Sequence, residues 1–237
     1  MNQLQQLHRD IKKLADPEKG KFLQRFFKTK EGEYGFGDVF VGLTVPMSRN
    51  IANQYKDLLP EEIETLLASF VHEERLIALL ILVDQFKKGS DYKKKEIYDF
   101  HIKHLQYINN WDLVDLSAYN IIGNYLLLTR DITFLVRLTS SKNIWERRIA
   151  IISTFAFIKK GSFKETLKIA EMLIHDKEDL IHKAVGWMLR EGGKKVSMEL
   201  EEVFLKKYYH TMPRTMLRYA IEKFPEEKRQ AYLKGRI

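Results

Sequence analysis

RIAI, at residues 148–151, is one of five related segments in this chain. The others are RLIA (75–78), DLSA (115–118), KAVG (183–186) and RYAI (218–221). Each begins with a charged residue and continues with apolar and small residues, and their first residues lie 40, 33, 35 and 35 positions apart. A period of roughly 35–40 residues is typical of proteins in which every repeat is a pair of helices.

The sequence between these segments is also helical in pattern. Apolar residues at 4, 7, 11 and 14 form an amphipathic stripe that Asp16-Pro17 ends, and residues 18–29 carry three phenylalanines on one face. Pro46 and Pro60 mark the first turns of further helices, and Gly89-Ser90 and Gly161-Ser162 each follow the end of one. Pro213 opens a last long helix that Pro225 ends. The chain is therefore predicted to be all-α, a single domain over residues 1–237 formed by about six HEAT-like helical hairpins in an α-solenoid.

One segment lacks a helical period. Residues 31–46, EGEYGFGDVFVGLTVP, contain four glycines. We expect an ordered loop whose aromatic side chains pack on the helices, and a short β-hairpin is the alternative.

The composition limits the function. The 237 residues carry a formal net charge of +8 and no cysteine, and the pI is near 9.4. Without cysteine, disulfides, thiolate zinc sites and iron–sulfur clusters are excluded. The polar first residues do not resemble a signal peptide, and the apolar run at 76–83 is too short to span a bilayer, so we expect a cytoplasmic protein with no membrane partner. A basic chain favours a polyanionic partner, although a solvated basic surface is an equal alternative.

The charged first residues of the five segments should form one row, because stacked repeats align equivalent positions. Four of them, Arg75, Arg148, Lys183 and Arg218, are cations that suit a phosphate backbone in a basic concave groove. The exception is Asp115, which shares a helical face with Trp111. The alternative to a functional role is that Trp111 is a core residue and that Asp115 pairs with an arginine. Asn110 or Asp112 could cap this helix.

Two more tryptophans occur beside cations. Lys183, Trp187 and Arg190 lie on one helical stripe, which suits DNA, although Trp187 could equally pack between repeats. Trp145 is expected to pack at a repeat junction, and Asn143 is expected to cap the start of its helix. His101 and His104 lack a third ligand at metal spacing, so we expect both on a solvated face. Phosphate-binding loops and nucleophile elbows are absent from the sequence.

Three motifs resemble those of the AlkD-type alkylpurine DNA glycosylases, which are built from HEAT-like repeats. These are WDLVD (111–115), IWERR (144–148) and HKAVGWMLRE (182–191), in the family's order and at similar spacing. The resemblance implies that Asp115 is the catalytic carboxylate, that Trp111 and Trp187 flank the lesion, and that Arg148 holds phosphate. Thr44 stands where many relatives place a longer DNA-probing side chain.

The resemblance implies a monofunctional glycosylase that removes cationic purines, of the 3-methyladenine and 7-methylguanine type, from double-stranded DNA. Lys183, Arg190, Arg214 and Arg218 are candidates for further backbone contacts. We expect no cofactor, no metal and a monomer. The alternative is a non-catalytic solenoid that binds DNA structures or protein partners, since fold alone does not fix function.

Overall fold

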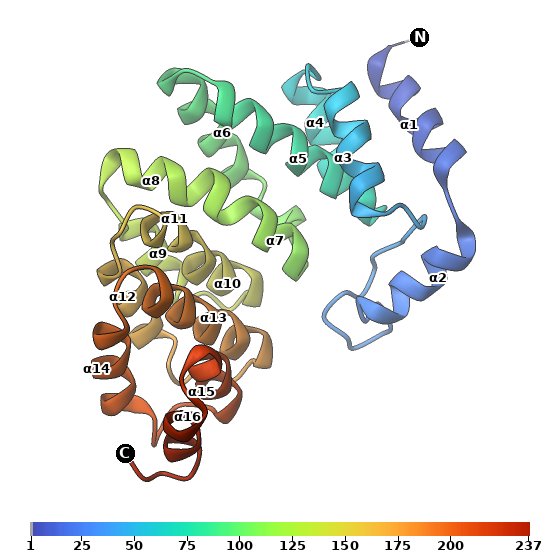
Figure 1. Ribbon diagram of the computed structural model, residues 1–237. Coiled ribbons are helices and arrows are strands. Elements are labelled where there is room, and N and C mark those ends of the chain that lie inside the picture. The colour runs from blue at the N-terminus through green and yellow to red at the C-terminus, as the bar shows by residue number, and fades with distance from the viewer. Residues whose placement is uncertain (1) are drawn as a thin grey trace. The chain divides into compact units, whose positions relative to one another are not determined.

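The computed structural model describes residues 2–237 and is all-helical apart from loops and one isolated parallel β-bridge between Val39 and Val71 (Figure 1). The chain divides into two compact units, Met1–Ser117 and Ala118–Ile237. No helix in the described part of the chain is long and apolar enough to cross a membrane.

The first unit contains α1 (Gln3–Leu14), α2 (Pro17–Phe26), α3 (Val45–Gln54), α4 (Pro60–Leu67), α5 (His72–Lys88), α6 (Asp91–Lys103) and α7 (Trp111–Ser117), with a 3-10 turn at Leu105–Tyr107. Helix α5 packs against α3, α4, α6 and α7. It is buried on several sides, which explains why its central residues, 76–83, are apolar without interruption. Asp16, Thr44 and Ser90 cap the helices that follow them, as their side-chain oxygens accept backbone N–H groups.

The segment between α2 and α3 is the ordered loop that its glycines predict. Val39 N donates to the carbonyl oxygen of Phe70 at 3.0 Å, and Val39 O accepts from His72 N at 2.8 Å. The buried carboxylate of Glu73 accepts the backbone N–H groups of residues 41–43 at 2.8–3.2 Å. The hairpin alternative is wrong, because residues 27–44 form only the isolated bridge.

The second unit begins with a π-helical segment, Ala118–Gly123, and continues with α8 (Asn124–Thr129), α9 (Thr133–Leu138), α10 (Ile144–Ser153), α11 (Phe155–Ile158), α12 (Lys164–Met172), α13 (Asp179–Lys195), α14 (Met198–Tyr208), α15 (Arg214–Ala220) and α16 (Glu226–Leu233). Helix α13 is its centre and packs against α10, α12, α14 and α15 (Figure 1).

Two glycines let helices of this unit approach closely. A Cβ atom on Gly186 would lie 2.4 Å from the carbonyl oxygen of Met216, and a Cβ on Gly123 would lie 2.2 Å from that of Ser153. Both distances are shorter than atoms allow, so α13 meets α15, and the π-helical segment meets α10, through glycine.

Two predictions need correction. The helix that Pro213 opens is short: it ends at Ala220, a 3-10 turn follows, and Pro225 precedes a further helix, α16, that the sequence reading missed. His101 and His104 are not on a solvated face but are 1% and 2% exposed. Burial lowers the pKa of His101 to about 3, so it is neutral, while His104 Nε2 lies 2.9 Å from Glu64.

Candidate nucleic-acid interface

Trp111 is the first residue of α7 and is half-buried. Its backbone N–H donates to Asn110 Oδ1 at 2.9 Å, so Asn110 rather than Asp112 caps the helix. The indole stacks on Phe27, with ring centres 5.2 Å apart and planes 9° apart, and Phe26 contacts it edge-on at 6.2 Å. Trp111 therefore packs against other residues of the first unit but stays partly exposed to solvent.

The aromatic side chains of α2 are divided between core and surface. Phe27, just after the helix, is buried, but Phe22 and Phe26 are each more than half exposed and stack on one another at 6.4 Å. The three phenylalanines were predicted to share one helical face, but only Phe27 contributes to the core. Together with Trp111 they form a continuous aromatic surface.

Asp115 lies one helical turn after Trp111 on α7 and is half-buried. Because it is on the same helix, its position depends on whatever fixes α7. The carboxylate of Asp112 turns inward instead and lies 2.8 Å from His72 Nε2. The sequence reading did not anticipate this contact.

His72 is the centre of a buried polar cluster beneath Trp111. Its Nδ1 lies 2.9 Å from Asp38 Oδ2, and Asp38 Oδ1 lies 2.6 Å from Arg75 Nη2. Burial lowers the pKa of His72, but the charge of Asp112 and hydrogen bonds to Asp112 and Asp38 outweigh it and raise the pKa to about 9. Burial raises the pKa of Asp38, yet the hydrogen bond from His72 and the charge of Arg75 bring it below its usual value.

Arg148, on α10 in the second unit, is 5% exposed. Its Nη1 donates to the carbonyl oxygen of Leu180 at 2.5 Å, close to the start of α13. Its neighbour Arg147 pairs with Asp176 through Nε at 2.6 Å. The predicted phosphate ligand is thus a largely buried side chain with a structural hydrogen bond of its own, and Arg75 of the predicted row is buried as well.

The cations on either side of Trp187 are paired with carboxylates. Lys183 Nζ lies 2.7 Å from Asp179, and Arg190 forms an ion pair with Glu222. The hydrogen bond from Lys183 holds the pKa of Asp179 below its usual value, so the pair is charged at neutral pH. This stripe on α13 is therefore less cationic than its sequence suggests. Trp187 itself is half-buried and lies 6.3 Å from Phe155.

The remaining predicted DNA contacts differ in exposure. Arg214 and Arg218 are exposed on α15, and Arg214 Nη2 donates to the carbonyl oxygen of Leu233 at 2.8 Å. The Thr44 hydroxyl accepts from Met47 N at 3.3 Å as the cap of α3. Arg218 thus offers the more available charge of the two arginines.

A cluster of lysines on aromatic rings escaped the sequence reading. Lys159 Nζ lies 4.9 Å from the ring centre of Tyr119 and 5.5 Å from that of Phe155, and Lys195 Nζ lies 6.0 Å from Phe155. Phe155 also adjoins Trp187, so these lysines and rings form an aromatic and basic cluster around Trp187 in the second unit. The four-residue spacing of Phe155 and Lys159 on a helical face was a usable signal.

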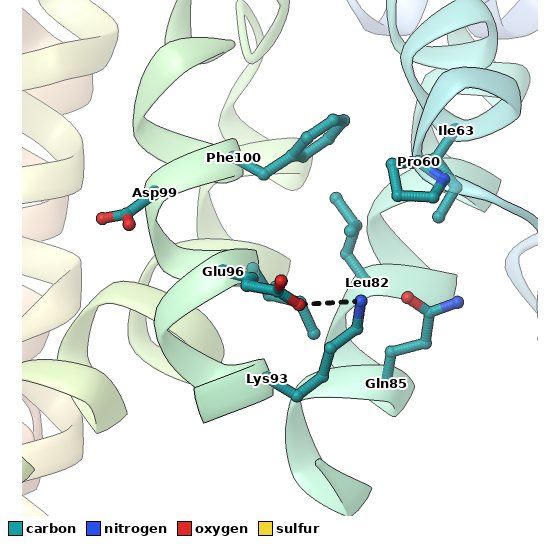
Figure 2. Close-up of a pocket in the computed structure, with 9 residues that line it drawn as sticks. Pro60, Ile63, Leu82, Gln85, Lys93, Glu96, Asp99 and Phe100 are labelled. Carbon is teal, nitrogen blue, oxygen red and sulfur yellow. Dashed lines mark hydrogen bonds and ion pairs between the residues drawn. The ribbon is translucent and has the colours of Figure 1, made fainter. Parts of the chain in front are cut away.

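The pocket in Figure 2 lies elsewhere, between α4, α5 and α6, with a volume of about 370 Å³. Pro60, Ile63, Leu82 and Phe100 supply apolar walls, and Lys93 pairs with Glu96 at its edge at 3.2 Å (Figure 2). It contains no residue predicted from the motifs. Among residues 2–237, no group of three or more His, Asp or Glu side chains could hold a metal ion.

The fold is an α-solenoid. It carries aromatic side chains around Trp111 in the first unit, and aromatic and basic side chains around Trp187 in the second. A family model described as DNA alkylation repair enzyme matches residues 7–224, and the chain belongs to that family. The all-α solenoid class and the resemblance drawn from the three motifs are confirmed. Membership assigns the chain to the repair of alkylated DNA.

Solved structures share the fold at low sequence identity. A predicted DNA alkylation repair enzyme from Enterococcus faecalis matches with a TM-score of 0.69 and 18% identity, over 90% of this chain and 97% of that one. AlkD2 from Streptococcus mutans matches with a TM-score of 0.55 and 19% identity, over 88% of this chain and 98% of its own. The smu.31 protein of Streptococcus mutans has the same score and identity, over 94% and 99%. No curated protein matches the sequence.

Proposed function

We propose that the protein is a monofunctional DNA glycosylase that hydrolyses the N-glycosidic bond of cationic alkylated purines in double-stranded DNA. The observation that carries the proposal is the pairing of Trp111 and Asp115 one turn apart on α7, both half-buried, in a chain of the alkylation repair family. An indole face and a carboxylate both favour a cation, and the substrate carries its charge on the base.

The chemistry requires little from the protein beyond electrostatics. A purine alkylated at a ring nitrogen is positively charged, so it leaves as a neutral base when the C1′–N bond breaks and takes the bonding pair. The sugar gains the positive charge, which the carboxylate of Asp115 stabilises. A water oxygen then adds to C1′, its proton passes to Asp115, and an abasic site remains. One such charge interaction contributes about 3–4 kcal/mol to catalysis.

The other site residues serve binding in this proposal. Trp111 and Trp187 contact the lesion nucleotide, and Arg148 steadies the DNA backbone beside it. Lys159 and Arg218 are exposed and supply phosphate contacts. The other three cations, Lys183, Arg190 and Lys195, must exchange their carboxylate partners for phosphate; that of Lys195 is Glu191, at 3.5 Å. Arg214 and Thr44 contribute at the periphery. The protein acts as a monomer and without a cofactor.

The decisive experiment measures bases released from methylated duplex DNA. We expect 3-methyladenine and 7-methylguanine in the soluble fraction, with no strand cleavage until the abasic sites are treated with alkali. Asp115→Asn preserves shape and removes the charge, so release should fall roughly 100-fold or more. Intact methylated DNA after incubation with folded wild-type protein would leave the non-catalytic DNA-binding solenoid as the function.

A further inference from the structure

The buried cluster around His72 connects three separate parts of the sequence. Asp38 comes from the loop between α2 and α3, His72 and Arg75 from the first turn of α5, and Asp112 from the first turn of α7. His72, Asp38 and Arg75 are each almost fully buried. Two carboxylates face an arginine and an imidazole, so the cluster is neutral when His72 is protonated.

The hydrogen-bond geometry requires that proton. Both ring nitrogens of His72 lie within 2.9 Å of carboxylate oxygens, and a neutral imidazole has only one N–H to donate. A protonated ring donates to both carboxylates. His72 therefore links the loop to α7 by two charge-assisted hydrogen bonds, which are shorter and stronger than neutral ones.

The same imidazole also reaches Trp111 through stacked rings. It lies against Phe40, with ring centres 4.4 Å apart, and against Phe27 at 5.0 Å, and Phe27 stacks on the indole of Trp111. A cation against aromatic faces is favourable. The position of Trp111 is thus fixed by the ring of Phe27, which stacks on the indole, and by Asp112, the next residue, which is bound to His72.

Stability alone does not explain a charged cluster in this place. Packed apolar side chains of similar volume often stabilise a core as well as a buried ion pair does. Directional hydrogen bonds add something that apolar contacts lack, namely a defined rotation and position for α7. Catalysis is sensitive to this, because a displacement of about 1 Å can reduce a rate 100-fold.

We propose that His72 is a positioning residue of the glycosylase site, which through Asp112 and Phe27 fixes α7 and thereby places the indole of Trp111 and the carboxylate of Asp115. The proposal rests on the proposed function. His72 touches neither the DNA nor the reacting atoms. Its role is to keep the two site residues of α7 in one geometry.

The test compares His72→Gln with His104→Gln. Both replace a buried histidine of the first unit that contacts a carboxylate, but His104 pairs with Glu64 at 2.9 Å and contacts the carbonyl oxygen of Phe100 at 2.7 Å, away from α7. Base release is measured in single turnover at saturating protein, well below the melting temperature of each variant. We expect His72→Gln to reduce release roughly 10- to 100-fold, with affinity for undamaged duplex unchanged within about twofold. His104→Gln should lower only the melting temperature.

A second readout does not depend on activity. The chain has three tryptophans, so its ¹⁵N spectrum contains three indole N–H signals that Trp→Phe variants assign. His72→Gln should shift or broaden the Trp111 signal and leave those of Trp145 and Trp187 unchanged. An unchanged Trp111 signal, or a wild-type release rate in folded His72→Gln, overturns the proposal. If the wild type releases no base, the proposed function fails, and the Trp111 signal still decides whether His72 fixes that ring.

Discussion

Raising the pH should destabilise the protein through one residue, His72. The folded state keeps its proton, with a pKa of about 9 against 6.5 for a free imidazole, because Asp112 and Asp38 accept from both ring nitrogens. The folded pKa is the higher one. The stabilisation is therefore fully present below about pH 6.5 and is lost as the pH rises through about 9.

The magnitude follows from the two pKa values. Each pKa difference of one corresponds to about 1.4 kcal/mol, so protonation of His72 contributes about 3 kcal/mol to the free energy of unfolding below pH 6.5. For a chain of this size, 1 kcal/mol changes the melting temperature by about 2–4 °C. The loss between pH 6 and pH 10 is then about 6–12 °C.

Thermal unfolding of the wild type and of His72→Gln between pH 6 and pH 10, at constant ionic strength, isolates this contribution. The other titratable groups are the same in both proteins, so their contributions cancel in the comparison. The difference in melting temperature between the two should therefore shrink by about 6–12 °C across the range. If the melting temperatures of the two proteins differ by the same amount from pH 6 to pH 10, His72 is not a protonated imidazole that donates to both carboxylates.

Three further predictions concern DNA binding and packing. Asp115→Asn should bind undamaged duplex as tightly as the wild type or slightly more tightly, because a charge that repels phosphate is gone; weaker binding in a fluorescence anisotropy titration would contradict this. Joint Lys159→Gln and Lys195→Gln substitution should make the slope of log K against log salt shallower by about 2, as two phosphate contacts are lost. The matched control, Lys164→Gln with Lys168→Gln on exposed positions of α12, should leave the slope unchanged. Gly123→Ala should cost about 1–3 kcal/mol in denaturant unfolding, because its Cβ would lie 2.2 Å from the carbonyl oxygen of Ser153, and an unchanged midpoint would contradict that close contact.

Local patterns predicted the helices well because their causes are local. The amphipathic stripe at residues 4–14 corresponds to α1, and Asn143 caps α10 by accepting from Trp145 N at 2.9 Å. Trp145 is buried, as expected of a packing residue, and three of the four glycines between α2 and α3 lie in turns. In each of these cases a few adjacent residues determine the outcome, and the sequence displays them together.

The buried cluster could not be predicted in this way. His72 pairs with residues 34 positions before it and 40 positions after it, and nothing in the sequence distinguishes it from His101 or His104. Those two were expected in solvent because no third ligand at metal spacing accompanies them in the sequence. The fold instead buries their side chains. Partners that are distant in sequence decide both burial and protonation, so a single-sequence pattern carries no signal for either.

Charge placement shows the same limit at the proposed DNA surface. The repeat pattern predicts a row of cations, yet Arg75 and Arg148 are buried and Lys183 has a carboxylate partner one turn away. A cation that is already paired gains less from a phosphate, because the existing ion pair must first be broken. Lys159 and Arg218, by contrast, are exposed. Affinity for undamaged DNA should therefore depend more on these two exposed residues than on the buried or paired cations of the row, which leaves those cations to hold the helices that carry the site.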